Sequence, residues 1–325
     1  ITNGTGSVLF TDASGVEQLN FALGTTIYVQ VNDTDQNADV NTAETVTVTV
    51  VSESDATGET VTLTETGVST GIFLGSVSAN LTATSGDILT ATYIDPLDDF
   101  GNEVTLIDEA YYNVTLLSGS YTGNVTWSAS SSPFLVTGDV TIGTSESTGS
   151  LTIDPGVEVR FLSVADDQSS GQDGNRSEII VHGWLFAAGT AADSIVFKTS
   201  RGTPVVGDWH SIQIRSSSSE NTKVSHCRFS GYTSALDIHT SSSDWSDNVN
   251  SYLSVDSIIV EHSVFTSAGT NALLSRSMYG YQFFFEDNII ESKNFFKGEY
   301  WDVPQFNAVG MRIKNNIARL GKGLE

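Results

Sequence analysis

Two acidic loops near the N-terminus carry the residue types and spacing of a calcium site. The first loop places oxygen-bearing side chains at alternate positions and adds a glutamate, in the series Asp33, Asp35, Asn37, Asp39 and Glu44. Calcium takes roughly six to eight oxygen ligands at short range, and alternation points successive side chains towards one centre. The spacing is that of an EF-type calcium loop. The loop departs from that type in two ways, since Ala38 replaces the turn glycine and strand-like sequence flanks it.

The second acidic loop, residues 95–103, supplies Asp95, Asp98 and Asp99. In a Greek-key sandwich the second and sixth strands run in the same direction, so the loops that follow them lie at one end. The two acidic loops follow the second and sixth predicted strands, and we expect their carboxylates to meet. Such crowding is costly unless a cation neutralises it. The predicted metal ligands are therefore the side chains named from both loops, with Ca²⁺ as the cofactor. A pair of solvated acidic turns is the alternative.

The elements that position these loops are short strands, recognised by alternating apolar and polar residues. The predicted strands are Ser7–Thr11, Thr25–Val31, Thr45–Ser52, Thr60–Thr64, Gly71–Ala79, Ile88–Ile94 and Val104–Val114. Strands at this spacing indicate an all-β fold that begins with an immunoglobulin-like β-sandwich over residues 1–118. The disulfide of antibody domains is missing, because Cys227 is the single cysteine of the chain. Its place in an alternating strand predicts a buried, inert thiol.

Residues 119–325 contain a recurring strand pattern. Four lines can be aligned: Val224-Ser-His-Cys-Arg-Phe229, Val260-Glu-His-Ser-Val-Phe265, Phe285-Glu-Asp-Asn-Ile-Ile290 and Ile313-Lys-Asn-Asn-Ile-Ala318. One strand signature in every roughly 20 to 50 residues indicates a solenoid, and strands this short, with no helical pattern between them, indicate a parallel β-helix. The third positions are His226, His262, Asp287 and Asn315. They form either a metal or catalytic row or a stacked polar ladder that sets the register of the coils.

Between the two acidic loops lies the run Glu65-Thr-Gly-Val-Ser-Thr-Gly-Ile-Phe-Leu-Gly75. It resembles the "E-T-G-x-x-T-G-x-F-x-G" run of the tandem, immunoglobulin-like modules found in large bacterial and archaeal surface proteins. The resemblance covers about residues 20–115. It implies a spacer or adhesin module that has no catalytic role.

A second resemblance concerns the solenoid. The segment Leu151-Thr-Ile-Asp-Pro-Gly-Val-Glu-Val-Arg-Phe161 resembles the opening of right-handed, pectate-lyase-like β-helix domains in secreted proteins. That fold carries lyases, hydrolases, adhesins and inert stalks, so the resemblance implies a fold and leaves the function open. Arg312-Ile-Lys314 matches a tripeptide of polygalacturonases. The acid/base motifs of that family are absent from the sequence, so its two-carboxylate chemistry is not carried over.

Four aromatic residues in or near long inserts are candidate ligands for sugar rings: Trp245, Tyr252, Tyr300 and Trp301. The inserts, at residues 165–177, 241–254 and 292–304, must leave the solenoid as loops. Loops on a rigid scaffold are where binding residues concentrate. The alternative is that these rings pack the inserts against the solenoid.

Acidic residues outnumber basic ones, 39 to 14, which gives a net charge of −25. So acidic a chain is a poor nucleic-acid binder and a poor ligand for anionic membranes. It also lacks a run of about 18 apolar residues that could enter a bilayer. Because it starts on Ile1, we expect a piece of a longer secreted or surface-anchored protein with neighbouring domains.

The predicted function is structural or adhesive, with the β-helix as a rigid display surface and a polysaccharide or cell-surface component as the candidate partner. The alternative is an enzyme, either a polysaccharide lyase or a glycoside hydrolase, with its site on a face of the β-helix.

Overall fold

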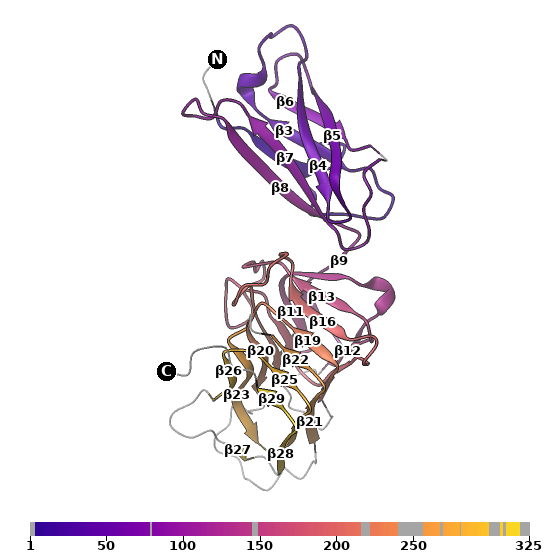
Figure 1. Cartoon of the computed structure of the whole chain (residues 1–325), viewed down its shortest axis with the longest axis vertical. Coiled ribbons are helices and arrows are strands. Elements are labelled where there is room, and N and C mark those ends of the chain that lie inside the picture. Colours follow the sequence, from indigo (N-terminus) through magenta and orange to yellow (C-terminus); the bar gives the residue numbers. More distant parts are fainter. Residues whose placement is uncertain are drawn as a thin grey trace. The chain divides into compact units, whose positions relative to one another are not determined.

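The computed structural model describes residues 4–78, 80–144, 149–215, 222–239, 256–266, 269–279, 281–298, 306–307 and 310–318. The chain is all-β, as predicted, with 52% of its residues in strands and 2% in helices. It divides into two compact units, Ile1–Val114 and Thr115–Glu325 (Figure 1). Each unit has its own hydrophobic core.

The division falls a few residues before the predicted boundary at 118/119. Strand β9 (Thr115–Tyr121) spans that position and pairs in parallel with β11 (Phe134–Ile142) of the second unit. The polar run that suggested a linker is therefore strand, because its backbone groups pair with the first coil of the second unit.

The first unit is one eight-stranded sheet. Its strands are β1 (Ser7–Thr11), β2 (Asn20–Phe21), β3 (Tyr28–Asn32), β4 (Thr45–Ser52), β5 (Asp55–Glu65), β6 (Ile72–Ser76), β7 (Ile88–Asp95) and β8 (Val104–Tyr112). They are ordered β1-β3-β6-β5-β4-β7-β8-β2. All pairs in this order are antiparallel except β2 with β8.

Alternation along the strands builds the core of this unit. In β4, Val46, Val48 and Val50 are buried, and the threonines between them are exposed, as the two-residue period of a strand requires. The sheet also folds back on itself, since the N–H of Phe10 in β1 donates to Asp108 Oδ2 of β8 at 2.6 Å. Both ends of the sheet thus enclose a single core.

The described strands of the second unit pair only in parallel. Seven of them form one sheet, in the order β10 (Val125–Trp127), β12 (Leu151–Ile153), β15 (Leu185–Ala188), β18 (Thr222–Ser225), β21 (Asp256–Glu261), β24 (Tyr281–Glu286) and β28 (Gly310–Lys314).

A fourteen-stranded sheet contains the remaining strands of this unit. They are β9, β11, β13 (Glu158–Phe161), β14 (Ile179–Val181), β16 (Ile195–Thr199), β17 (Trp209–Ile214), β19 (Cys227–Phe229), β20 (Tyr232–His239), β22 (Val264–Phe265), β23 (Asn271–Tyr279), β25 (Ile289–Ile290), β26 (Asn294–Gly298), β27 (Phe306–Asn307) and β29 (Ile317–Ala318). Both sheets contribute to one core, so each passage of the chain adds a rung to a solenoid-like stack.

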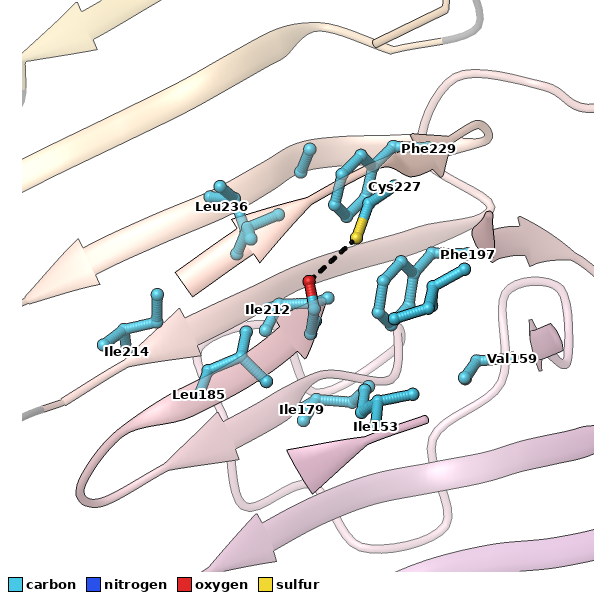
Figure 2. Packing of buried hydrophobic residues seen from close by; sticks show 14 of the residues in the cluster. Ile153, Val159, Ile179, Leu185, Phe197, Ile212, Ile214, Cys227, Phe229 and Leu236 are labelled. Carbon is cyan, nitrogen blue, oxygen red and sulfur yellow. Dashed lines mark hydrogen bonds between the residues drawn. The ribbon is translucent and has the colours of Figure 1, made fainter. Parts of the chain in front are cut away.

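Aromatic rings stack along the interior of this unit. The ring of Phe229 lies between those of Phe197 and Phe265, with centroids 5.0 and 4.9 Å away and nearly parallel planes. Figure 2 shows Phe197 and Phe229 together with the surrounding aliphatic side chains. Cys227 is fully buried among them, and its Sγ donates to the carbonyl oxygen of Ala187 at 3.4 Å, the dashed line of Figure 2. Burial raises the pKa of the Cys227 thiol, which is the inert state predicted for it.

The repeated third positions of the sequence lie at one corner of the solenoid. His226, His262, Asp287 and Asn315 all have positive φ, between 50° and 54°, where the chain turns from one sheet to the other. Asn, Asp and His are the non-glycine residues most enriched in this left-handed region. The rings of His226 and His262 stack with a centroid distance of 4.8 Å and an interplanar angle of 1°. The corner therefore accounts for the residue types in terms of backbone conformation.

The residue after each corner links one coil to the next. The N–H of Cys227 donates to Ser263 Oγ at 3.1 Å, and that of Ser263 donates to Asn288 Oδ1 at 2.9 Å. The N–H of Asn288 donates in turn to Asn316 Oδ1 at 3.0 Å. These side chains satisfy backbone donors that the turn removes from the sheets.

Candidate metal centre

Three aspartates from the two acidic loops come together in the first unit. Asp33 directly follows β3, Asp35 lies in the single 3-10 turn η1 (Thr34–Gln36), and Asp95 ends β7. One carboxylate oxygen from each lies within 4.8 Å of the others. Asp33 and Asp95 are 1% and 0% exposed. The loops after the second and sixth predicted strands thus meet at these three residues.

Hydrogen bonds fix this arrangement. Asp33 Oδ1 accepts from the N–H of Asp35 at 3.2 Å and so caps η1, and Asp33 Oδ2 accepts from the hydroxyl of Tyr93 at 2.6 Å. Asp95 accepts from the N–H groups of Gly6 and Leu97 at 2.8 and 2.9 Å. The carboxylates are therefore positioned by the backbone before any ligand arrives.

The electrostatics of the cluster favour a bound cation. Burial, followed by the nearby carboxylates of Asp35 and Asp95, raises the pKa of Asp33 to about 6, although the Tyr93 hydroxyl lowers it. Burial alone would raise the pKa of Asp35 as well, but hydrogen bonding, chiefly with Asp33, holds it below its ordinary value. In the empty site Asp33 is the group that takes up a proton. A cation would replace that proton and keep all three groups ionised.

The first unit has no basic side chain. All 14 Lys and Arg residues and all 5 His residues of the chain lie between residues 115 and 325. A buried carboxylate in residues 1–114 can therefore be neutralised only by a proton or by a cation from solution, apart from hydrogen-bond donors. This segregation can be read directly from the sequence, and it strengthens the cation hypothesis more than the spacing of the first loop does.

The other predicted ligands of the second loop have partners of their own. Asp98 Oδ1 accepts from the N–H groups of Phe100 and Asn102, both at 2.8 Å, within its own turn. Asp99 Oδ2 accepts from the hydroxyl of Thr5 at 3.0 Å. Neither belongs to the group formed by Asp33, Asp35 and Asp95.

The first loop divides after Asp35. Asn37 Nδ2 donates to Ser69 Oγ at 3.2 Å, and the N–H of Asp39 donates to Glu44 Oε1 at 2.6 Å. Asp39 and Glu44 are not members of the three-aspartate group. The reason is local, since η1 turns the chain just after Asp33 and breaks the alternation that would aim all five side chains at one centre.

The carboxylates of the second unit hold an insert in place. Asp139 in β11 accepts from the N–H groups of Ser170 and Gly171 at 2.7 and 2.5 Å. Glu178, next to β14, accepts from the N–H of Gln172 at 2.6 Å. Both carboxylates are 0% exposed. The predicted insert at 165–177 is thus fastened to the sheet by the acidic groups beneath it.

One histidine joins this arrangement. His210 Nδ1 lies 2.5 Å from the second carboxylate oxygen of Glu178. Burial, together with the charges of Glu178 and Asp166, raises the pKa of Asp139. These groups are packed and paired with one another, and they do not face solvent.

No family model matches the chain, and no curated protein matches it.

The predicted sugar-binding aromatics cannot be placed in the fold. Trp245, Tyr252, Tyr300 and Trp301 all lie outside the described residues. Within the described part of the chain, no helix is long and apolar enough to cross a membrane.

Proposed function

We propose that the first unit is an immunoglobulin-like β-sandwich stiffened by calcium and that the second is a right-handed parallel β-helix. The chain would then be a structural or adhesive part of an extracellular surface protein. Support for the β-helix comes from the parallel pairing of two sheets around one core and from the side-chain ladder between coils. Support for the sandwich comes from the antiparallel sheet folded over a single core.

The observation that carries the calcium proposal is the buried group of Asp33, Asp35 and Asp95 in a unit without basic side chains. Carboxylate oxygens suit calcium, magnesium and manganese rather than softer metals. The set is irregular and comes from two loops and a strand end. Calcium tolerates such geometry, whereas magnesium demands near-octahedral coordination. When bound, the ion would tie the ends of β3 and β7 together.

A structural role is favoured over catalysis by the state of the second unit's carboxylates. A glycoside hydrolase needs two carboxyl groups roughly 5 to 10 Å apart that can reach the substrate. Asp139 and Glu178 are fully buried, and they are engaged by the backbone of the insert they hold. The solenoid surface then serves as a rigid face for contact with a polysaccharide or a cell-surface component.

A glycan-array binding assay, run beside a reducing-sugar release assay on acidic polysaccharides, tests this function. We expect retention of the chain on a subset of glycans and no release of reducing sugar above the buffer control. The Glu178→Gln variant serves as the matched control for the release assay. Reducing-sugar release by the parent chain that is lost in Glu178→Gln would contradict the structural role and favour the enzyme.

A further inference from the structure

We propose that the first unit holds a second cation site, separate from the three aspartates and formed by Asn37, Glu44 and Glu65, and that it takes a divalent ion of the calcium class. This inference shares with the proposed function only the class of the ion. Its residues and its test are different.

Two enclosed oxygen atoms without donors point to a ligand. Asn37 Oδ1 and Glu44 Oε2 are both fully shielded from solvent, and neither accepts a hydrogen bond within the described chain. The other polar atom of each side chain is held, since Asn37 Nδ2 donates to Ser69 Oγ and Glu44 Oε1 accepts from the N–H of Asp39. Enclosed acceptors are normally paired, and each exception requires a physical explanation. A cation supplies the missing partner to both oxygens.

Both side chains lie against the same turn. The N–H of Glu65 donates to the carbonyl oxygen of Glu44 at 2.9 Å, and the N–H of Glu44 lies 3.4 Å from Glu65 Oε2. Asn37 reaches Ser69 of the turn that follows Glu65. An amide oxygen and two carboxylates therefore converge from the two sides of one strand pair.

The carboxylate of Glu65 is set by the sequence run that begins with it. Glu65 is 5% exposed, and its Oε1 accepts from the N–H groups of Thr70 and Gly71 at 2.6 and 2.7 Å. Gly71 has a φ of +63°, and a Cβ there would lie 2.8 Å from the Cα of Thr34. The Glu, Thr and Gly of the "E-T-G-x-x-T-G" run thus orient one oxygen of Glu65 inwards and leave the other beside Glu44.

Charge distinguishes a cation from a bound water. Glu44 and Glu65 are adjacent carboxylates in a unit that contains no Lys, Arg or His. A water molecule could donate to the enclosed oxygens, but it would leave both charges uncompensated. Oxygen ligands of this kind match a hard divalent cation.

Calcium titration of the full chain by isothermal calorimetry, with magnesium in excess, tests the proposal. Isosteric variants separate the two sites, because Glu44→Gln keeps the shape of its side chain and Asp35→Asn does the same for the three-aspartate site. We expect each variant to bind one ion fewer than the parent chain and the double variant to bind two fewer. Asn37→Ala is a further variant that keeps both carboxylates, and it should weaken the second site by about tenfold or more.

The outcomes separate the two proposals. Loss of one ion in Asp35→Asn, with unchanged stoichiometry in Glu44→Gln and unchanged affinity in Asn37→Ala, would overturn the second site and leave the first. Loss of one ion only in Glu44→Gln would overturn the three-aspartate site and leave the second. Identical titrations for the parent chain and the double variant would overturn both.

Discussion

Replacing Phe229 with alanine is expected to destabilise the second unit by roughly 3 to 5 kcal/mol. The ring is 1% exposed and lies between Phe197 and Phe265 at the centre of the solenoid. Removing it deletes buried apolar surface and opens a cavity that neighbouring coils, held in register by their sheets, cannot close. Calorimetry of the full chain should show one unfolding transition moved to lower temperature and the other unchanged.

Phe186 provides the matched control. It lies in β15 of the same unit but points outwards and is 40% exposed. Phe186→Ala should change the free energy of unfolding by no more than about 0.5 kcal/mol. Equal effects of the two substitutions would mean that the Phe197–Phe229–Phe265 stack is not the centre of the core.

In the absence of divalent cations, the first unit is expected to become more stable as the pH falls from 7 to 5. The folded-state pKa of Asp33 is about 6, against an ordinary value of 3.8. Between these values the folded chain binds more protons than the unfolded chain, so stability falls as the pH rises. The full contribution is present below 3.8 and is lost as the pH rises through 6. Its size is on the order of 3 kcal/mol.

Calcium should reverse this trend. A bound ion requires Asp33 to be ionised, so acid then competes with the ion and lowers stability over the same range. The acidic groups with lowered pKa values, such as Asp87, act below about pH 4. Burial also raises the pKa of Asp108, which acts in the same direction as Asp33.

Asp33→Asn is the control for this prediction. It keeps an acceptor for Tyr93 and removes the titration, so the rise in stability towards pH 5 should be largely lost. Urea unfolding in EDTA and in calcium, at pH 7 and pH 5, measures all four conditions. A parent chain that is less stable in EDTA at pH 5 than at pH 7 would contradict the assigned environment of Asp33.

Much of the fold was predictable because strand periodicity is local. The alternation of Val46, Val48 and Val50 with threonine defines β4 directly, and its predicted bounds match the structure. The strand β2 (Asn20–Phe21) is too short to show any period, and it was not predicted. The linker interpretation of the segment after Leu117 failed because pairing with β11 is a tertiary effect.

The candidate site was only partly predictable. Direction of strands was enough to bring Asp33 and Asp95 to one end, but the spacing of the first loop overstated its unity. Side chains such as Tyr93 and Glu65 join the acidic groups through tertiary contacts, and no local pattern signals them. The row headed by His226 shows the opposite case, since a corner with positive φ selects the same residue types as a ligand set.

Calorimetry of the full chain in calcium and in EDTA tests the central claim, that a cation at Asp33, Asp35 and Asp95 stiffens the first unit. The transition that Phe229→Ala lowers identifies the second unit, so the other transition reports on the first. We expect EDTA to lower the Tm of the first unit and Asp35→Ala to abolish the difference between calcium and EDTA. A first-unit Tm that is the same in calcium and EDTA would contradict the account.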